Sequence, residues 1–334
     1  MRCIDEKKGH FIINLFISTQ LHISGPGPNG ARMGKLYIYV FPISAHMSKM
    51  YVNLNLTELQ IIRTLADGPA SMKMLAQKFK SSFSWVFKCI DNLKTIGFVQ
   101  TSKSGRSSQA ALSSTTLGNR LMTFLKESDY PNPELVLEGR SLCIMPLLVP
   151  DGANCSEIIE LSGLSRRTVI TYLGFWRDVG LLVFDRPTYR INPRHDTLIE
   201  LLRAFSEHVN ISIAGALGIP YAMLWQGRGE FIISVDREID SAGFSKAADT
   251  ALDDLGIDLI HRSDYYLYNP SRRKVSKAEA LVQAIVIDRN EPRMARYIRK
   301  VASSNKRLRT AILFEARRYG IEEFVTEVLA NART

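Results

Sequence analysis

A segment of this chain occurs twice, without a gap and 83 positions apart, and this repeat constrains the fold more than any other feature. The two copies are residues 71–99 and residues 154–182. Their shared positions, at offsets 0, 4, 7 and 11, are three apolar residues and a glycine: Val86, Ile90, Leu93 and Gly97 in the first copy, Val169, Leu173, Trp176 and Gly180 in the second. These offsets place three apolar side chains on one stripe of a helix and a glycine where that helix ends.

Each copy predicts a short helix, a turn and a longer helix, followed by a β-hairpin. Leu75 and Ala76 lie on the first short helix, and Ile158 and Ile159 lie on the second. The first hairpin has strands 98–102 and 109–112 around a turn at 103–108, and the second has strands 181–184 and 189–192 around a turn at 185–188. The sequence therefore predicts two helix-turn-helix units of the same design.

The stripe opposite the apolar residues of the longer helix is free for a ligand. In the second copy Ser165 is expected to cap the helix, after which Arg167 and Thr171 share one exposed row and Thr168 and Tyr172 share the next. Donors in the first two turns suit phosphates and base edges in a major groove that is wide enough for a helix. The matching surface of the first copy is less basic, so its helix is expected to contact DNA bases more weakly. That surface consists of Ser82, Ser84, Trp85 and Lys88.

Both hairpins carry cationic residues near their turns. A flexible cationic turn suits a neighbouring phosphate or the minor groove. The candidate DNA-binding residues are therefore Ser82, Ser84, Trp85, Lys88, Lys103, Arg106, Ser165, Arg166, Arg167, Thr168, Thr171, Tyr172, Arg186 and Arg190.

These units resemble the winged helix-turn-helix transcription regulators of bacteria and archaea, the MarR-like group in particular. The residues that carry the resemblance are Leu56-Thr57-Glu58, Leu75-Ala76, Val86, Ile90, Leu93, Gly97-Phe98-Val99 and residues 112–118 in the first copy, and Ile158, Leu164-Ser165, Val169, Leu173, Gly180-Leu181-Leu182 and the hairpin ending at Asn192 in the second. The resemblance covers roughly half of the chain. It implies a cytoplasmic regulator that binds double-stranded DNA, as a homodimer or with its two units on successive grooves. Winged helices also serve as protein-docking modules, and that alternative stays open.

The charge of the chain favours a polyanionic partner. Its 43 Lys and Arg against 33 Asp and Glu give a formal net charge of +10. Such an excess draws a protein to nucleic acid and makes binding fall steeply with salt. RNA and an anionic membrane surface fit less well, because the chain lacks an aromatic RNA-binding sheet signature and a basic amphipathic helix beside an apolar anchor.

Composition excludes several other classes. No apolar run approaches the ~20 residues of a membrane span, so we expect a soluble protein without membrane contact. Cys3, Cys89, Cys143 and Cys155 are scattered, which suits a reducing cytosol, and Cys89 is expected to be core filler. The six histidines are isolated and no phosphate-binding loop is present, so the sequence implies neither a metal site nor a cofactor.

The remainder of the chain predicts an α+β protein, with two winged helix units followed by a small α+β domain and a helical tail. Helices are expected at residues 57–66, 117–126 and 197–209 beside the two copies, and a strand at residues 35–41. Later in the chain, strands are expected at 230–235, 257–261 and 265–268 around a helix at 245–255, with tail helices at 278–286, 292–302, 306–319 and 321–330. The expected parts are 1–50, 51–127, 134–210 and 211–334. The first of them is an extension that fits none of these units, and two interpretations stay open for it: a start codon assigned too far upstream, or a disordered segment.

The C-terminal part also resembles, more loosely, regions of archaeal winged-helix regulators and of AbiEi-type antitoxins. The likeness rests on residues 265–268, Ser276, residues 281–284 and residues 316–321. It implies a regulatory or interaction domain, with an effector or a toxin-like protein as partner. The basic residues of the tail, from Arg289 to Arg318, favour a solvated helix face, with an extended DNA footprint or an acidic partner as alternatives.

A nucleotidyltransferase is the remaining alternative. Asp236 and Glu238 stand two positions apart at a strand end, and Asp258 would supply a third acid for a metal. Such a site also needs a Gly-Ser turn about a dozen residues upstream, and Gly227-Arg228-Gly229 is too close and lacks the serine. The sequence therefore favours a protein without catalytic activity.

Overall fold

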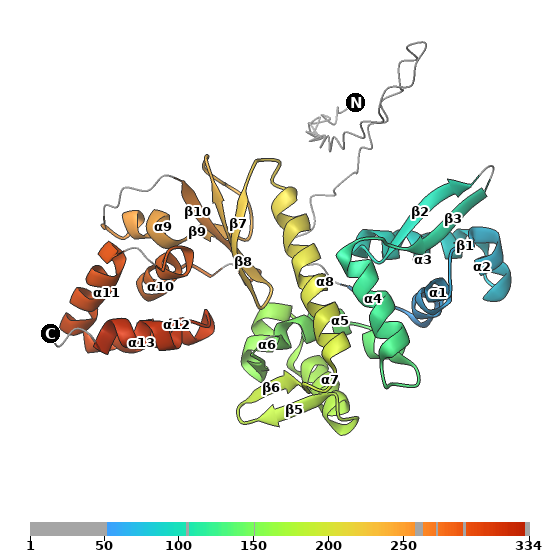
Figure 1. Ribbon diagram of the computed structural model, residues 1–334, viewed down its shortest axis with the longest axis horizontal. Coiled ribbons are helices and arrows are strands. Elements are labelled where there is room, and N and C mark those ends of the chain that lie inside the picture. Colours follow the sequence, from blue (N-terminus) through green and yellow to red (C-terminus); the bar gives the residue numbers. More distant parts are fainter. Residues whose placement is uncertain are drawn as a thin grey trace, which may run out of the picture. The chain divides into compact units, whose positions relative to one another are not determined.

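The computed structural model describes residues 52–104, 107–149, 151–257, 263–271, 273–289 and 292–330. Within these ranges the chain is a mixed α+β protein with three small antiparallel sheets (Figure 1). The strand expected at residues 35–41, the side chain of Arg106 and the carboxylate of Asp258 lie outside the described residues.

The first copy of the repeat folds as a short strand, two helices and a hairpin, with a helix on either side. The short strand pairs with the second hairpin strand, Ala70 opposite Ala110, so the sheet order is β1-β3-β2. The elements are α1 (Leu56–Ala66), β1 (Ala70–Ser71), α2 (Met72–Lys78), α3 (Phe83–Ile96), β2 (Val99–Ser104), β3 (Ser107–Leu112) and α4 (Thr116–Glu127).

The second copy has the same order of elements. Ala153 pairs with Tyr189 and the sheet order is β4-β6-β5, which matches the first sheet strand for strand. The elements are η1 (Pro133–Leu137), α5 (Ser141–Ile144), η2 (Met145–Leu148), β4 (Ala153–Asn154), α6 (Cys155–Ser162), α7 (Arg166–Asp178), β5 (Leu182–Asp185), β6 (Thr188–Ile191) and α8 (Asp196–Gly215). Both predicted helix pairs and both hairpins are confirmed.

Side-chain caps fix where the helices of the repeat begin. Ser82 Oγ accepts the N–H of Trp85 at 3.2 Å at the start of α3, and Ser165 Oγ accepts the N–H of Thr168 at the same distance at the start of α7. Asn154 and Glu157 form a capping box at α6, with Asn154 Oδ1 accepting the Glu157 N–H at 3.0 Å. These local bonds explain why a sequence pattern alone located the helices.

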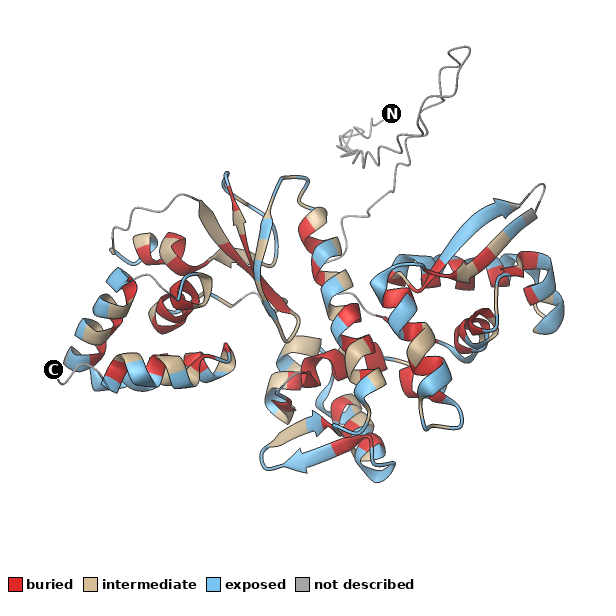
Figure 2. Cartoon of the chain, in the orientation of Figure 1, coloured by how far each residue is buried: buried red, intermediate tan, exposed pale blue. Residues whose placement is uncertain are grey.

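One hydrophobic core runs through both copies in the described part of the chain, from Val52 to Phe205. Helix α8 packs against α4 of the first copy, and the rings of Phe98 and Phe205 lie 6.2 Å apart between centroids. The buried residues of this core line the inner faces of the helices, whereas much of β2 and β5 is exposed (Figure 2). The two copies are therefore packed together through their flanking helices.

The C-terminal part contains a four-stranded antiparallel sheet of order β7-β8-β10-β9. Its elements are β7 (Ala222–Gly227), β8 (Glu230–Val235), β9 (Phe244–Lys246), α9 (Ala248–Asp254) and β10 (Asp264–Tyr268). Strands β8 and β10 confirm the expected ones. Ile257 lies outside every described strand, and the rest of the strand expected at 257–261 lies outside the described residues.

Two features of this sheet were not predicted. The expected helix at 245–255 begins only at Ala248, because Ser245 and Lys246 pair with Leu267 and Tyr266 as part of β9. Strand β7 was missed; it alternates exposed and half-buried residues and is joined to β8 by Arg228 and Gly229, both with positive φ. Two consecutive residues of positive φ are typical of a tight hairpin turn, although arginine is an unusual residue for that position.

The sheet is covered on both faces, which explains the apolar run in β8. Phe231, Ile233 and Val235 pack toward the end of α8, whereas Ile232 and Leu267 pack toward the helices that follow the sheet. Those helices are α10 (Lys277–Ile287), α11 (Pro292–Ser304), α12 (Lys306–Arg318) and α13 (Glu322–Ala330). They confirm the four predicted tail helices, and α10 is buried from Ala278 through Ile285 (Figure 2).

Candidate nucleic-acid interface

Two arginines stand at the N-terminus of α7. Ser165 caps the helix, so the chain turns sharply and the first helical residues, Arg166 and Arg167, are exposed. Neither guanidinium forms a hydrogen bond or ion pair with another described residue. The cap thus orients the backbone while both cations face solvent.

The hydroxyl groups of the two threonines that follow on α7 form hydrogen bonds within the helix or its cap. Thr171 is exposed, and its hydroxyl donates to the carbonyl of Arg167 at 2.9 Å. Thr168 is half-buried, with its hydroxyl 2.9 Å from Ser165 Oγ in the cap. Each hydroxyl oxygen keeps accepting capacity for one outside donor.

Tyr172 does not belong to the exposed row, and that expectation is wrong. Its hydroxyl accepts the backbone N–H of Arg140 at 2.9 Å, and its ring lies 5.1 Å from that of Trp176. A Cβ at Gly139 would lie 2.3 Å from this hydroxyl. Tyr172 therefore fastens α7 to the segment that opens the second copy, a long-range contact that helical spacing does not reveal.

Sequence reasoning missed the apolar residues on the outer face of α7. Ile170 is 49% exposed, and it lies one turn after Arg166 and Arg167. Phe175 is also exposed further along the helix. The surface of α7 thus combines two unpaired cations, a threonine and a large apolar side chain.

The outer face of α3 has a different chemistry. Ser84 and Lys88 are exposed as expected, and Ser82 serves as the cap. Three large apolar side chains of this helix are also exposed: Phe83 at 57%, Trp85 at 43% and Phe87 at 55%. At the positions where α7 carries Arg166 and Arg167, α3 carries Phe83 and Ser84, so the weaker basic character of α3 is retained in the folded chain.

The hairpins place their cations unequally. Arg186 is exposed in the β5–β6 turn, whereas Arg190 forms an ion pair with Asp185 in which Nη2 and Oδ2 are 2.6 Å apart. Lys103 is exposed near the end of β2. Arg186 and Lys103 are therefore the hairpin cations most available to a phosphate.

The carboxylates weighed for catalysis lie on the surface. Asp236 and Glu238 are exposed just after β8. Among the described residues, no group of three or more His, Cys, Asp or Glu side chains is arranged to hold a metal ion. Burial raises the pKa of Cys89 to about 11, so this core thiol is protonated at neutral pH.

The basic tail divides into two environments, and the expectation of a solvated face is wrong for one of its arginines. Arg317 is exposed and pairs with Glu322 at 2.6 Å. Arg318 points inward and forms ion pairs with Glu230, Glu279 and Glu315. Glu279 is fully buried and also accepts hydrogen bonds from Arg273 and from the Tyr319 hydroxyl.

The two buried carboxylates of this cluster have opposite pKa shifts. Burial raises the pKa of Glu230 above its usual value, against the charges of Arg318 and Arg273. Burial acts in the same direction on Glu279, but hydrogen bonds and charge from Arg273 and Arg318 outweigh it and hold the pKa of Glu279 below its usual value. Helix α12, β8 and α10 are joined through these charges.

Comparison with protein-family models and with curated proteins gives no match for this chain. No helix in the described ranges is both long enough and apolar enough to cross a membrane.

Proposed function

We propose that this protein is a sequence-specific DNA-binding transcription regulator whose two repeat units are winged helix-turn-helix domains. The observation that carries the proposal is the start of α7, where a serine cap presents Arg166 and Arg167 to solvent without partners among the described residues. A helix of about 10–12 Å diameter fits a major groove of about 12 Å width. Arginine is the side chain that most often reads guanine there, through two hydrogen bonds.

The neighbouring residues of α7 support the same role. Ile170 offers an apolar contact of the kind that thymine methyl groups accept, and Thr171 offers a hydroxyl to a base or a phosphate. Lys103 and Arg186 lie at the hairpins, where each would neutralise one phosphate. The formal net charge of +10 would accelerate the encounter with DNA at low salt.

The first test is selection from a randomised duplex pool with the full chain across a salt series. We expect an enriched motif that persists at about 150 mM salt, with affinity falling as salt rises. A pool in which nothing is enriched, with binding lost at that salt, would overturn the proposal.

The second test is Arg167→Ala, with Arg177→Ala as a matched control on the same helix. Arg177 lies in the last turn of α7 and pairs with Asp178 at 3.4 Å. Loss of Arg167 should cost about 1–3 kcal/mol on the selected site and relax the preference at one position, measured by fluorescence anisotropy on matched and mismatched duplexes. The control should bind like the parent chain; equal losses in the two variants would contradict a reading role for the start of α7.

Protein docking is a second candidate function, and it concerns the first unit. The exposed Phe83, Trp85 and Phe87 on α3 are more typical of a protein contact than of a DNA-reading surface. Phe87→Ser should leave DNA affinity unchanged if α3 docks a protein, and should weaken it if α3 enters a groove.

A further inference from the structure

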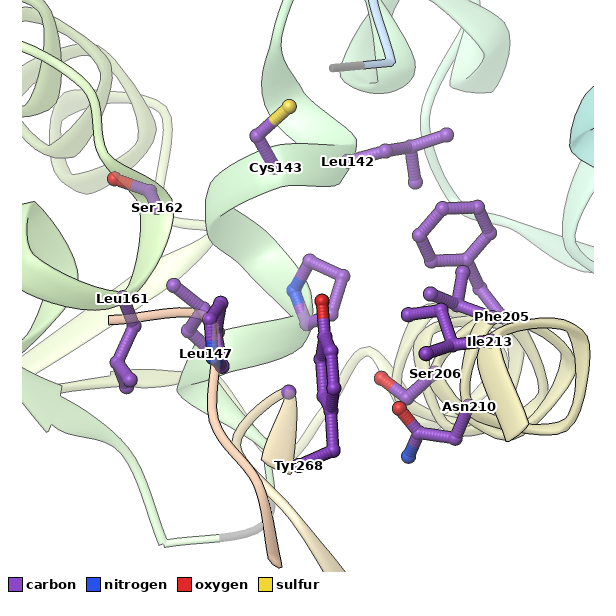
Figure 3. Close-up of a pocket in the computed structure, with 14 residues that line it drawn as sticks. Leu142, Cys143, Leu147, Leu161, Ser162, Phe205, Ser206, Asn210, Ile213 and Tyr268 are labelled. Atoms are coloured by element: carbon purple, nitrogen blue, oxygen red, sulfur yellow. The ribbon is translucent and has the colours of Figure 1, made fainter. Parts of the chain in front are cut away.

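The outer face of α11 carries an open hollow whose chemistry differs from that of the cavity beside α8. That cavity lies between α5, η2, α6, α8 and the end of β10, and most of its lining is apolar (Figure 3). The lining of the hollow on α11 is Arg293, Arg296, Tyr297 and Lys300. Three cations around one aromatic ring suit an anionic ligand that also offers a flat ring.

The hollow lies in the part of the chain that holds most of the positive charge. Residues 292–318, which include α11 and α12, contain nine Lys and Arg against one acid, Glu315. This stretch carries a formal charge of +8, whereas the rest of the chain carries +2 of the total of +10. The electrostatic attraction for polyanions is therefore concentrated on these two helices.

Two cations beside the hollow are not used within the protein. Arg299 donates from Nε to the carbonyl of Ala295 at 3.2 Å, and Arg318 pairs with buried carboxylates. Arg296 and Lys300 are exposed, and neither side chain forms a hydrogen bond or ion pair with another described residue. These two free charges stand about one helical turn apart.

The opposite face of α11 is already buried. Met294, Ile298 and Ala302 recur every fourth residue, are 5%, 0% and 4% exposed, and belong to the core that α11 shares with α10 and α12 (Figure 2). A basic amphipathic helix binds a lipid surface by burying its apolar face in that surface. Since this apolar face is covered, the charged face is left for a soluble polyanion.

Tyr297 favours a polyanion that carries flat rings. It follows Arg293 by four positions and precedes Lys300 by three, so it lies in the same row as these cations. The side chain is half-buried: it packs against the C-terminal core and also lines the hollow. An aromatic side chain that is fixed by packing and flanked by cations can stack an unpaired base, while the cations contact the adjoining phosphates.

A single strand fits this hollow better than a duplex does. In a duplex the bases are stacked on one another, so phosphates could reach Arg296 and Lys300 but no base face could reach Tyr297. A single strand can splay one base out of its stack and keep both phosphate contacts. RNA and single-stranded DNA offer this chemistry equally.

We propose that the hollow on α11 is a binding site for single-stranded nucleic acid, with one base stacked on Tyr297 and the adjoining phosphates held by Arg296 and Lys300. Its sequence preference should be weak, because every base has a face that can stack. This site goes beyond the duplex-reading role proposed for α7 and does not depend on it.

The binding test uses the full chain and fluorescence anisotropy with three labelled strands of about twelve nucleotides: oligo(dT), oligo(rU) and an abasic strand. We expect dissociation constants of about 1–100 μM for oligo(dT) or oligo(rU) near 150 mM salt. The abasic strand, which has the phosphates but no bases, should bind at least about tenfold more weakly. A preference for one of the two base-containing strands would identify the source as RNA or DNA. An abasic strand that binds as tightly as both would overturn the site.

Tyr297→Leu tests the stacked base. It should weaken oligo(dT) binding about tenfold and leave binding of the abasic strand unchanged, because leucine can pack against the core but offers no ring. Tyr297→Phe is the matched control; it keeps the ring and should bind like the parent chain. Undiminished oligo(dT) binding by Tyr297→Leu, or an equal loss in the two variants, would overturn the stacking role.

The double variant Arg296→Gln with Lys300→Gln tests the phosphate contacts. The slope of log affinity for oligo(dT) against log salt should fall in magnitude by about 1.4, since each lost contact to a single strand removes about 0.7. Arg317→Gln removes an exposed arginine that is already paired with Glu322, and it should leave the slope as it was. An unchanged slope in the double variant would overturn these contacts.

The double variant Arg166→Ala with Arg167→Ala separates this site from the start of α7. It should lose affinity for the selected duplex and bind oligo(dT) like the parent chain, whereas Tyr297→Leu should do the reverse. Loss of oligo(dT) binding in the α7 variant would place the single strand on α7 and overturn the site. A duplex selection that enriches nothing, beside oligo(dT) binding that depends on Tyr297, would overturn the proposed function alone.

Discussion

At the scale of single residues, the buried charges of the C-terminal part are the contacts most sensitive to change. Glu230 and Glu279 are 1% and 0% exposed, and Arg318 contacts both. Removing one partner of a buried ion pair leaves an uncompensated charge, which costs far more than losing a surface pair. Arg273 also pairs with both carboxylates, so loss of Arg318 leaves two buried carboxylates with one arginine between them.

Arg318→Met should lower the free energy of unfolding by about 3–5 kcal/mol at neutral pH, measured by urea denaturation. The matched control is Arg317→Met at the adjacent residue, whose side chain is 73% exposed; it should change stability by less than about 0.5 kcal/mol. Similar losses in the two variants would contradict a special role for the buried arginine.

The loss caused by Arg318→Met should shrink as pH falls. The pKa of Glu279 lies below its usual value in the folded chain, so its contribution to stability is present above its unfolded pKa and is lost as pH falls through the folded pKa. The pKa of Glu230 is raised, so its contribution runs in the opposite sense and is lost as pH rises. Without Arg318 both carboxylates take up protons more readily, so acid removes the uncompensated charge. Urea denaturation of the parent chain and of Arg318→Met, from pH 7 to lower pH, measures this effect. A difference in the free energy of unfolding that does not change with pH would contradict it.

At the scale of elements, a glycine follows each of the helices α3 and α7, but the two glycines have different surroundings. Gly97 follows α3 with a φ of +91°, and a Cβ there would lie 2.3 Å from Nε2 of His208 on α8. Gly180 follows α7 with a φ of +77°, and a Cβ there would meet nothing within 4 Å. The end of α3 is thus packed against α8, whereas the end of α7 has space beside its glycine.

Gly97→Ala should lower the free energy of unfolding by about 2–4 kcal/mol, because left-handed strain and overpacking against His208 add. Gly180→Ala is the matched control and should cost only the backbone strain, about 1–2 kcal/mol. Thermal or urea unfolding of both variants measures the difference. If Gly180→Ala were as damaging as Gly97→Ala, the contact with His208 would carry no energy.

At the scale of the whole molecule, the shared core has a consequence for DNA binding. Because α8 packs against α4, the two copies are parts of one packed body, and the two hairpins are held in a fixed relation. Under the proposed function, a duplex long enough to reach both hairpins would meet them in that relation. The formal net charge of +10 adds a salt-dependent attraction that does not distinguish sequences.

The double variant Lys103→Ala with Arg186→Ala removes one exposed cation near each hairpin turn. If both hairpins hold phosphates at once, the slope of log affinity against log salt should fall in magnitude by about 1.8, since each lost phosphate contact removes about 0.9. Sequence preference should not change. Arg317→Met, which removes an exposed arginine already paired with Glu322, should leave the slope as it was. A decrease of only about 0.9 would mean that one unit binds alone.

Much of the fold could be predicted from the sequence, because the signals are local. Helices α3, α6 and α7 each have a serine or asparagine before the first turn, apolar residues that repeat with the helical period of 3.6, and a glycine after the last turn. This pattern locates the helices without reference to the rest of the fold. The exposed start of α7 could be predicted for the same reason, since Arg166 and Arg167 follow a cap and oppose the apolar stripe.

The sequence failed where pairing partners are distant. Strand β9 and the delayed start of α9 depend on pairing with β10 some twenty residues later, and β7 depends on β8 across an Arg-Gly turn. The inward direction of Tyr172 depends on the backbone at Arg140, and that of Arg318 on carboxylates from β8 and α10. Helical spacing places such residues on a face but does not say which neighbour covers that face.

The sequence by itself determined the two repeat units, their caps and hairpins and the basic character of α7, because backbone hydrogen bonds and apolar periodicity act over a few residues. Only the tertiary structure decided which polar residues stay available to a ligand, which arginine is buried, and where a cavity lies between α6, α8 and the C-terminal sheet. Those outcomes arise when segments far apart in the chain compete to cover the same surface, and burial then decides which charges must be paired.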